Sequence, residues 1–110
     1  MDPTFQITYK NLETSDALDN YVREQIDRLV RAFARIHSLN VIIDQPHRSQ
    51  QQGNAFHVGI KIHIPGAEIV VNRNGAKPAS EDAYLAVHSA FDEARRKLME
   101  HVDSHFRPRH

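Results

Sequence analysis

Residues 80–101 read SEDAYLAVHSAFDEARRKLMEH, and this stretch decides the fold because it predicts a long helix with a defined start. Ser80 is a good N-cap, since its hydroxyl can accept hydrogen bonds from the free amides of the first turn. Glu81 and Asp82 follow, where negative charge suits the positive end of the helix dipole. One apolar face then recurs at steps of three and four residues: Tyr84, Val87, Phe91, Ala94 and Leu98. We therefore expect both aromatic residues of this face to lie in the core.

A second helix is expected near the N-terminus, from Asp16 to about Arg35. Ser15 is its expected N-cap. Its apolar stripe consists of Leu18, Val22, Ile26, Leu29, Val30 and Phe33. The opposite side is charged, and an acid precedes a base at i,i+4 in two pairs, Glu24–Arg28 and Asp27–Arg31.

Four segments alternate apolar and polar residues as half-buried strands do: 5–9, 39–44, 56–64 and 68–72. Pro65-Gly66 predicts a turn that joins the last two strands in a hairpin. Loops are expected at QPHRSQQQGN, residues 45–54, and around residues 74–78.

This element order predicts an α+β fold, β-α-β-β-β-α, in a single domain over residues 1–110. A strand, a helix and a second strand favour a right-handed parallel crossover, and the last three strands favour an antiparallel meander. The simplest arrangement lays both helices on one face of a four-stranded mixed sheet. The other face is expected to meet water and carries Thr4, Gln6, Thr8, Asn40, His57, Lys61 and His63.

The composition sets limits on the class of protein. The chain has 110 residues, of which 40% are hydrophobic and 25% charged, as is typical of one soluble domain. It has no cysteine, which excludes a disulfide, a thiolate nucleophile and a cysteine zinc site. No apolar run approaches a membrane span and no signal peptide is evident, so we expect a cytoplasmic protein. The 14 basic and 14 acidic residues balance, which counts against a nucleic-acid binder unless a local basic patch exists.

No residue spacing indicates catalysis. No triad, phosphate-binding loop or pair of carboxylates stands out, and we expect neither an enzyme nor a cofactor. His57 and His63 share one face of a strand but lie about 20 Å apart, too far to hold one metal ion. His101 and His105 are one helical turn apart but lack a third ligand, so no metal site is expected.

A resemblance to a known family emerges from several segments. EDAY, then AV and RRKL, resembles the last helix of the ribosome hibernation promoting factors, the RaiA/YfiA type of ribosome-associated translation inhibitor. LETSDAL and RLVRAF resemble the start and later part of the family's first helix, and IKIHIPGAEIVV its third strand, turn and fourth strand. Together these segments cover nearly the whole chain in the family's order. Two features depart from the family: NRNGAKPAS is longer than usual, and Glu93 and Glu100 stand where members commonly have Lys.

The resemblance implies a function. The chain would occupy the mRNA and tRNA channel of the small ribosomal subunit and keep idle ribosomes inactive under stress. Its partner would be the rRNA phosphate backbone of the small subunit. Binding to a membrane or to a small-molecule substrate is not expected. It would be the short type, because long members continue into a dimerisation domain. The alternative is a protein-interaction module on the same fold with weak RNA affinity, which the neutral charge, Glu93 and Glu100 favour.

Basic residues are the candidate RNA contacts. Arg28 and Arg31 match basic positions in the family's first helix, and Arg96 matches an Arg in its last helix, so the three could form one surface. Further candidates are Arg35, Lys61, Arg73, Lys77, Arg95 and Lys97. The alternative interpretation is a solvated helix surface with intrahelical ion pairs. The eight histidines add a hypothesis, namely that acidification strengthens phosphate binding through His57 and His63.

Overall fold

Four strands and two helices make up the part of the chain that the computed structural model describes, residues 3–45, 56–72 and 82–106. The elements are β1 (Thr4–Lys10), α1 (Asp16–Ala32), β2 (Ser38–Asp44), β3 (His57–Ile64), β4 (Ala67–Asn72) and α2 (Ala83–Phe106). The predicted order and fold class are confirmed. The expected loops at 46–54 and 74–78 lie outside the described residues.

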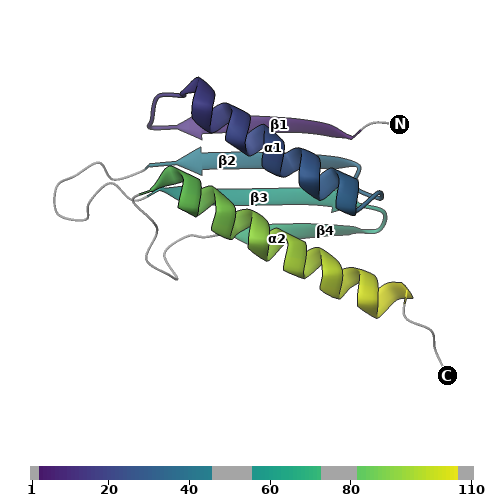
Figure 1. Cartoon of the computed structure of the whole chain (residues 1–110). Coiled ribbons are helices and arrows are strands. Elements are labelled where there is room, and N and C mark those ends of the chain that lie inside the picture. Colours follow the sequence, from purple (N-terminus) through teal and green to yellow (C-terminus); the bar gives the residue numbers. More distant parts are fainter. Residues whose placement is uncertain (1–2, 46–55, 73–81, 107–110) are drawn as a thin grey trace.

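The sheet has the strand order β1-β2-β3-β4. β1 and β2 run parallel with α1 as their crossover, and the other pairs are antiparallel. The turn between β3 and β4 contains Gly66, whose φ of 75° lies in the left-handed region that glycine adopts without strain. Both helices lie over the same face of the sheet and run in the same direction (Figure 1).

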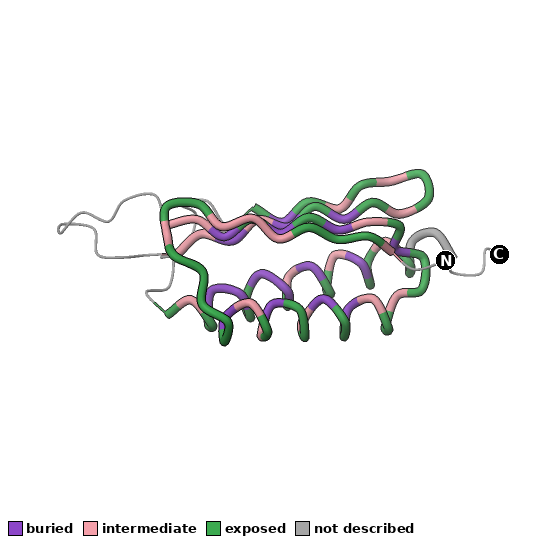
Figure 2. Tube along the Cα trace, turned by 90° about the horizontal axis from the view of Figure 1, so that it is seen from above, coloured by how far each residue is buried: buried purple, intermediate pink, exposed green. Residues whose placement is uncertain are grey.

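The core fills the space between the two layers, where the buried positions of helices and sheet face each other (Figure 2). The first helix buries Leu18, Val22, Ile26 and Leu29 as predicted, while Val30 and Phe33 are only partly buried. The second buries Ala86, Val87, Ala90, Phe91, Ala94 and Leu98. Every described polar or charged side chain is at least partly exposed, so apolar contact is what holds the layers together.

The predicted start of the last helix is wrong by two residues. α2 begins at Ala83, and Asp82 caps it: its Oδ1 accepts from the backbone N–H of Tyr84 at 2.9 Å and of Leu85 at 3.4 Å. Aspartate is as good an N-cap as serine, and its charge also suits the helix dipole. The expected cap, Ser80, lies outside the described residues.

Two further expectations about the helices are corrected. Tyr84 is not in the core: it is 41% exposed, and its ring meets that of Tyr21 edge-on at a centroid distance of 5.2 Å. The buried face of α2 instead includes the small residues Ala86 and Ala90. α1 ends at Ala32 rather than near Arg35, since Phe33 already has extended backbone angles.

A hydrogen-bonded cluster ties the edge strand β1 to α1. The Tyr9 hydroxyl donates to Asp19 Oδ1 at 2.8 Å, and Arg23 Nε donates to Asp19 Oδ2 at 2.7 Å. The Arg23 guanidinium also lies 5.5 Å from the centre of the Phe5 ring. The hydrogen bonds from Arg23 and Tyr9 hold the pKa of the Asp19 carboxyl below its usual range. Burial and the bond to Asp19 raise the pKa of the Tyr9 hydroxyl.

This cluster predicts an acid-sensitive contribution to stability. The folded pKa of Asp19 is depressed, so its contribution is present above the unfolded pKa of about 3.9 and is lost as pH falls through the folded value. We expect Asp19→Asn to lower the free energy of unfolding by on the order of 1 kcal/mol at neutral pH, with the difference shrinking below about pH 4. Urea unfolding at several pH values measures it.

Asp27→Asn is the matched control on the same helix. Asp27 pairs with Arg31 across an exposed surface, its side chain being 59% exposed. Such pairs contribute about 0–1 kcal/mol. If both variants change stability equally at every pH, the cluster does not stabilise the joint between β1 and α1.

Candidate nucleic-acid interface

Four of the predicted basic residues on the two helices have well-exposed side chains. Arg28, Arg31 and Arg96 have side chains that are 64%, 78% and 62% exposed. Arg95 is exposed as well. The helices lie side by side over one face of the sheet (Figure 1), so these arginines belong to the helical layer and not to the open face of the sheet. We call Arg28, Arg31, Arg95 and Arg96 the helical arginines.

A groove of about 220 Å³ runs between the helices and brings two helical arginines together. Arg28 reaches it from α1 and Arg95 from α2. The other lining residues are Tyr21, Glu24, Gln25, His88, Phe91 and Asp92. The groove is therefore polar, with two cations and two carboxylates in its walls.

Arg96 is the α2 residue that the family resemblance groups with Arg28, but the residue that lines the groove with Arg28 is Arg95. Consecutive helical residues point about 100° apart, so only one of the two can face α1. The burial of Phe91 and Leu98 fixes the rotation of α2 and turns Arg95 towards the groove. The rotation could have been estimated from the apolar stripe, whose mean direction lies nearer Arg95 than Arg96.

Ion pairs partly neutralise this surface. Arg28 lies 3.9 Å from Glu24 and Arg31 2.9 Å from Asp27, both at i,i+4. In α2, Glu93 lies 3.9 Å from Arg96 and 3.7 Å from Lys97. Arg95 has no ion pair with the described part of the chain. Exposed pairs are worth about 0–1 kcal/mol each, so a phosphate oxygen can replace the carboxylate partner at little cost.

Lys97 and Lys61 do not join the helical arginines. Lys97 turns towards the sheet, where its Nζ donates to the carbonyl oxygen of Val70 on the edge strand β4 at 2.8 Å. Lys61 lies on the open face of the sheet, in the cross-strand row with Asn40 and Val70. The helices cover the opposite face, so the sheet separates Lys61 from the helical arginines.

The three remaining candidates stand apart as well. Arg35 follows the end of α1 and lines a separate, largely apolar groove at the far end of the helical layer together with Met99 and Val102. Arg73 and Lys77 lie outside the described residues.

The histidines of the open face are also far from the helical layer. His63 Nε2 lies 3.1 Å from Glu68 Oε2, so this imidazole faces a carboxylate of the neighbouring strand. His57 shares the face at the other end of β3. Among residues 3–45, 56–72 and 82–106, no three His, Asp or Glu side chains cluster in a way that could hold a metal ion. The described helices are also too short or too polar to cross a bilayer.

Comparison with known proteins gives consistent matches. Residues 5–105 match a family described as sigma 54 modulation protein / S30EA ribosomal protein. A ribosome hibernation promoting factor from Azotobacter vinelandii is 35% identical over 97 residues, which cover 88% of this chain and 80% of that protein. One from Pseudomonas putida is 30% identical over the same length, with 84% of that protein covered.

Two solved structures resemble the fold. A ribosomal subunit interface protein from Coxiella burnetii matches with a TM-score of 0.71 at 17% identity, over 89% of this chain and 96% of that one. The N-terminal domain of Protein Y from Thermus thermophilus matches with a TM-score of 0.69 at 20% identity, over 90% and 98%. At these identities the likeness concerns the fold.

Proposed function

Because this chain belongs to the sigma 54 modulation protein / S30EA ribosomal protein family, as the resemblance implied, we propose that it binds the small ribosomal subunit and keeps idle ribosomes inactive. The family is not one of enzymes, so the protein acts by occupying space. It fills the channel that mRNA and tRNA use, in the cytoplasm, as one domain. The expected family is confirmed. That the chain binds in the channel, and through which residues, is what we propose.

The observation that carries this proposal is the convergence of Arg28 and Arg95 on one groove between two helices. A guanidinium offers a fork of donors that matches two phosphate oxygens. Arg31 and Arg96 belong to the same helical layer, and both are well exposed. Contacts of this kind fix the orientation of a protein on RNA without reading its sequence. A rigid helical layer with four arginines therefore suits the irregular phosphate surface of an rRNA channel.

The neutral charge of the chain shapes how such binding would behave. Carboxylates of Glu24, Asp27, Asp92 and Glu93 lie among the helical arginines. These acids reduce long-range attraction, so affinity must come from close contacts made after encounter. We expect binding to fall steeply as salt rises, because each neutralised phosphate releases counterions.

Sedimentation with purified ribosomes tests the proposal. The chain is expected to pellet with small subunits at about 100 mM salt and to leave them progressively at higher salt. Added mRNA and initiator tRNA should compete with it, since they would use the same channel. If the chain stays in the supernatant even at low salt, the second candidate holds.

That second candidate is a protein-interaction module on the same fold with weak RNA affinity. Glu93 favours it, because a single carboxylate lies close to both Arg96 and Lys97 and offsets their charge. Glu100 adds an exposed acid one helical turn after Arg96. Replacing Glu93 and Glu100 by Lys separates the two functions. Under the first, ribosome binding strengthens; under the second, it stays absent while the protein partner is lost.

A further inference from the structure

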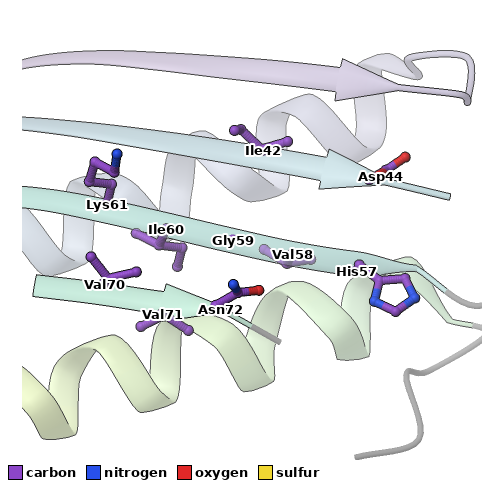
Figure 3. A pocket seen from close by; sticks show the side chains of 10 residues that line it. All are labelled: Ile42, Asp44, His57, Val58, Gly59, Ile60, Lys61, Val70, Val71 and Asn72. Atoms are coloured by element: carbon purple, nitrogen blue, oxygen red, sulfur yellow. The ribbon is translucent and has the colours of Figure 1, made fainter. Parts of the chain in front are cut away.

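The open face of the sheet has a hollow of about 260 Å³ whose lining includes Gly59. Gly59 lies in the middle of β3, and its cross-strand partners are Ile42 on β2 and Asn72 on β4. Its neighbours along the strand on this face are His57 and Lys61. Figure 3 shows these side chains standing around the bare ribbon at Gly59. A side chain at Gly59 would therefore occupy part of the hollow.

The fold does not require glycine at this position. Gly59 has no positive φ angle, and the nearest atom to a Cβ built there would be the carbonyl oxygen of Val71 at 3.6 Å, an ordinary contact. Glycine is a poor residue for a strand interior, because it adds no packing and loses the most backbone entropy. An unforced glycine in a central strand often marks the close approach of a ligand to the backbone.

The walls of the hollow combine an apolar strip with polar groups at its rim. Ile42 and Val70 form the apolar strip, and their side chains are 41% and 42% exposed. Asp44 accepts a hydrogen bond from Asn11 through Oδ1, and Oδ2 remains as an acceptor. His57 lines the hollow, and its Nδ1 is buried without a hydrogen-bond partner among the described residues.

This combination fits a flat heteroaromatic ring that carries donors and acceptors on its edge. The bare backbone of Gly59 and the methyl groups of Ile42 and Val70 offer a surface for one ring face. The Asn72 amide can pair with a base edge, and a carboxylate such as Asp44 accepts from an exocyclic amine. Lys61 forms no ion pair with the described part of the chain and would take the phosphate of the same nucleotide.

We propose that the hollow over Gly59 binds an unpaired nucleobase, with Lys61 on its phosphate. The inference rests on the proposed function for its partner, a single-stranded segment of ribosomal RNA or mRNA. It gives the protein a second RNA contact on the face opposite the helical arginines. Unpaired bases are the parts of RNA that proteins read by stacking and edge contacts. Adenine and cytosine, whose exocyclic amines suit Asp44, are preferred over uracil.

Titration of the labelled protein with short oligo(A), oligo(C) and oligo(U), followed by the shifts of backbone amide resonances, tests the site. Oligo(A) and oligo(C) are expected to move the resonances of Ile42, Gly59 and Asn72, and oligo(U) to move them less. Gly59→Val fills the hollow with a residue that favours strands, so it is expected to fold and to bind the oligonucleotides about tenfold more weakly. Gln6→Val adds the same side chain to the same face outside the hollow, and is expected to bind like the parent.

The outcomes distinguish a free nucleotide from RNA as the ligand, and they distinguish failure of this site from failure of the proposed function. Equal binding of adenosine monophosphate and oligo(A) supports the base site and assigns it to a free nucleotide, whereas tighter oligo(A) binding assigns it to RNA. Unchanged binding by Gly59→Val, or shifts confined to the helical layer, overturns the site. The site is also overturned if the resonances around Gly59 move only when small-subunit proteins are added and not with any oligonucleotide. The hollow would then bind a protein side chain. The titration contains no ribosomes, so its result stands whether or not the chain sediments with them.

Discussion

Phe91→Ala is expected to lower the free energy of unfolding by about 3–5 kcal/mol. Phe91 is only 4% exposed and belongs to the apolar core, beneath the groove between the two helices. Truncation removes most of its buried area and leaves a cavity that rigid strands cannot close. Small domains have about 5–15 kcal/mol of stability in total, so the variant should unfold at a much lower urea concentration.

His88→Ala is the matched control, one helical turn before Phe91. His88 is exposed and lines the groove between the helices. Its loss removes no buried area, so stability should stay within about 0.5 kcal/mol of the parent. Equal urea midpoints for the two variants would mean that the buried face of α2 has been assigned wrongly.

The sequence was enough to predict the layers of this fold. Alternation in the strands correctly separated the residues that face the helices, such as Ile60 and Ile62, from Lys61 and His63 on the open face. Period-two and period-3.6 patterns are strong here because each element has one buried face. Turn residues located the hairpin, because the turn at Pro65-Gly66 needs a positive φ angle that glycine adopts without strain.

The predictions that were wrong concern the start of α2 and the burial of Tyr84. Ser80 and Asp82 are both good caps, and sequence offers no means of ranking them. Tyr84 has the spacing of the apolar stripe, but its ring pairs with Tyr21 from the other helix, a contact that depends on how the helices are placed. The same applies to the hollow at Gly59, which exists only because of the register between three strands.

The candidate RNA contacts could be chosen from the sequence by charge and exposure, but their positions around the helices could not. Any exposed cation on a helix qualified, and Lys97 resembled Arg95 in sequence. The structure shows Lys97 bonded to the edge of β4 and Arg95 lining the groove between the helices. Those two positions differ by about 200° around the helix axis, so the rotation of α2 decides which of them lines the groove between the helices.

Replacing Arg28, Arg31 and Arg96 together by Ala is expected to weaken ribosome binding and to flatten its dependence on salt. Each lost phosphate contact lowers the slope of log K against log salt by up to about one unit, so the triple variant should lose up to about three. The three side chains are well exposed, and their ion pairs contribute about 0–1 kcal/mol each, so the variant should remain folded. A triple variant that binds as tightly as the parent would remove the helical layer as the RNA surface.

A pair of single variants makes the test specific to the groove. Arg95→Ala and Lys97→Ala each remove one positive charge from the same helix, so the net charge of the two proteins is equal. Arg95 lines the groove with Arg28 and has no ion pair among the described residues, whereas Lys97 donates to Val70. Only Arg95→Ala is therefore expected to lower the slope, by about one unit, in sedimentation with small subunits over a range of salt. If both variants lower it equally, binding follows net charge, and the groove between the helices has no special part in it.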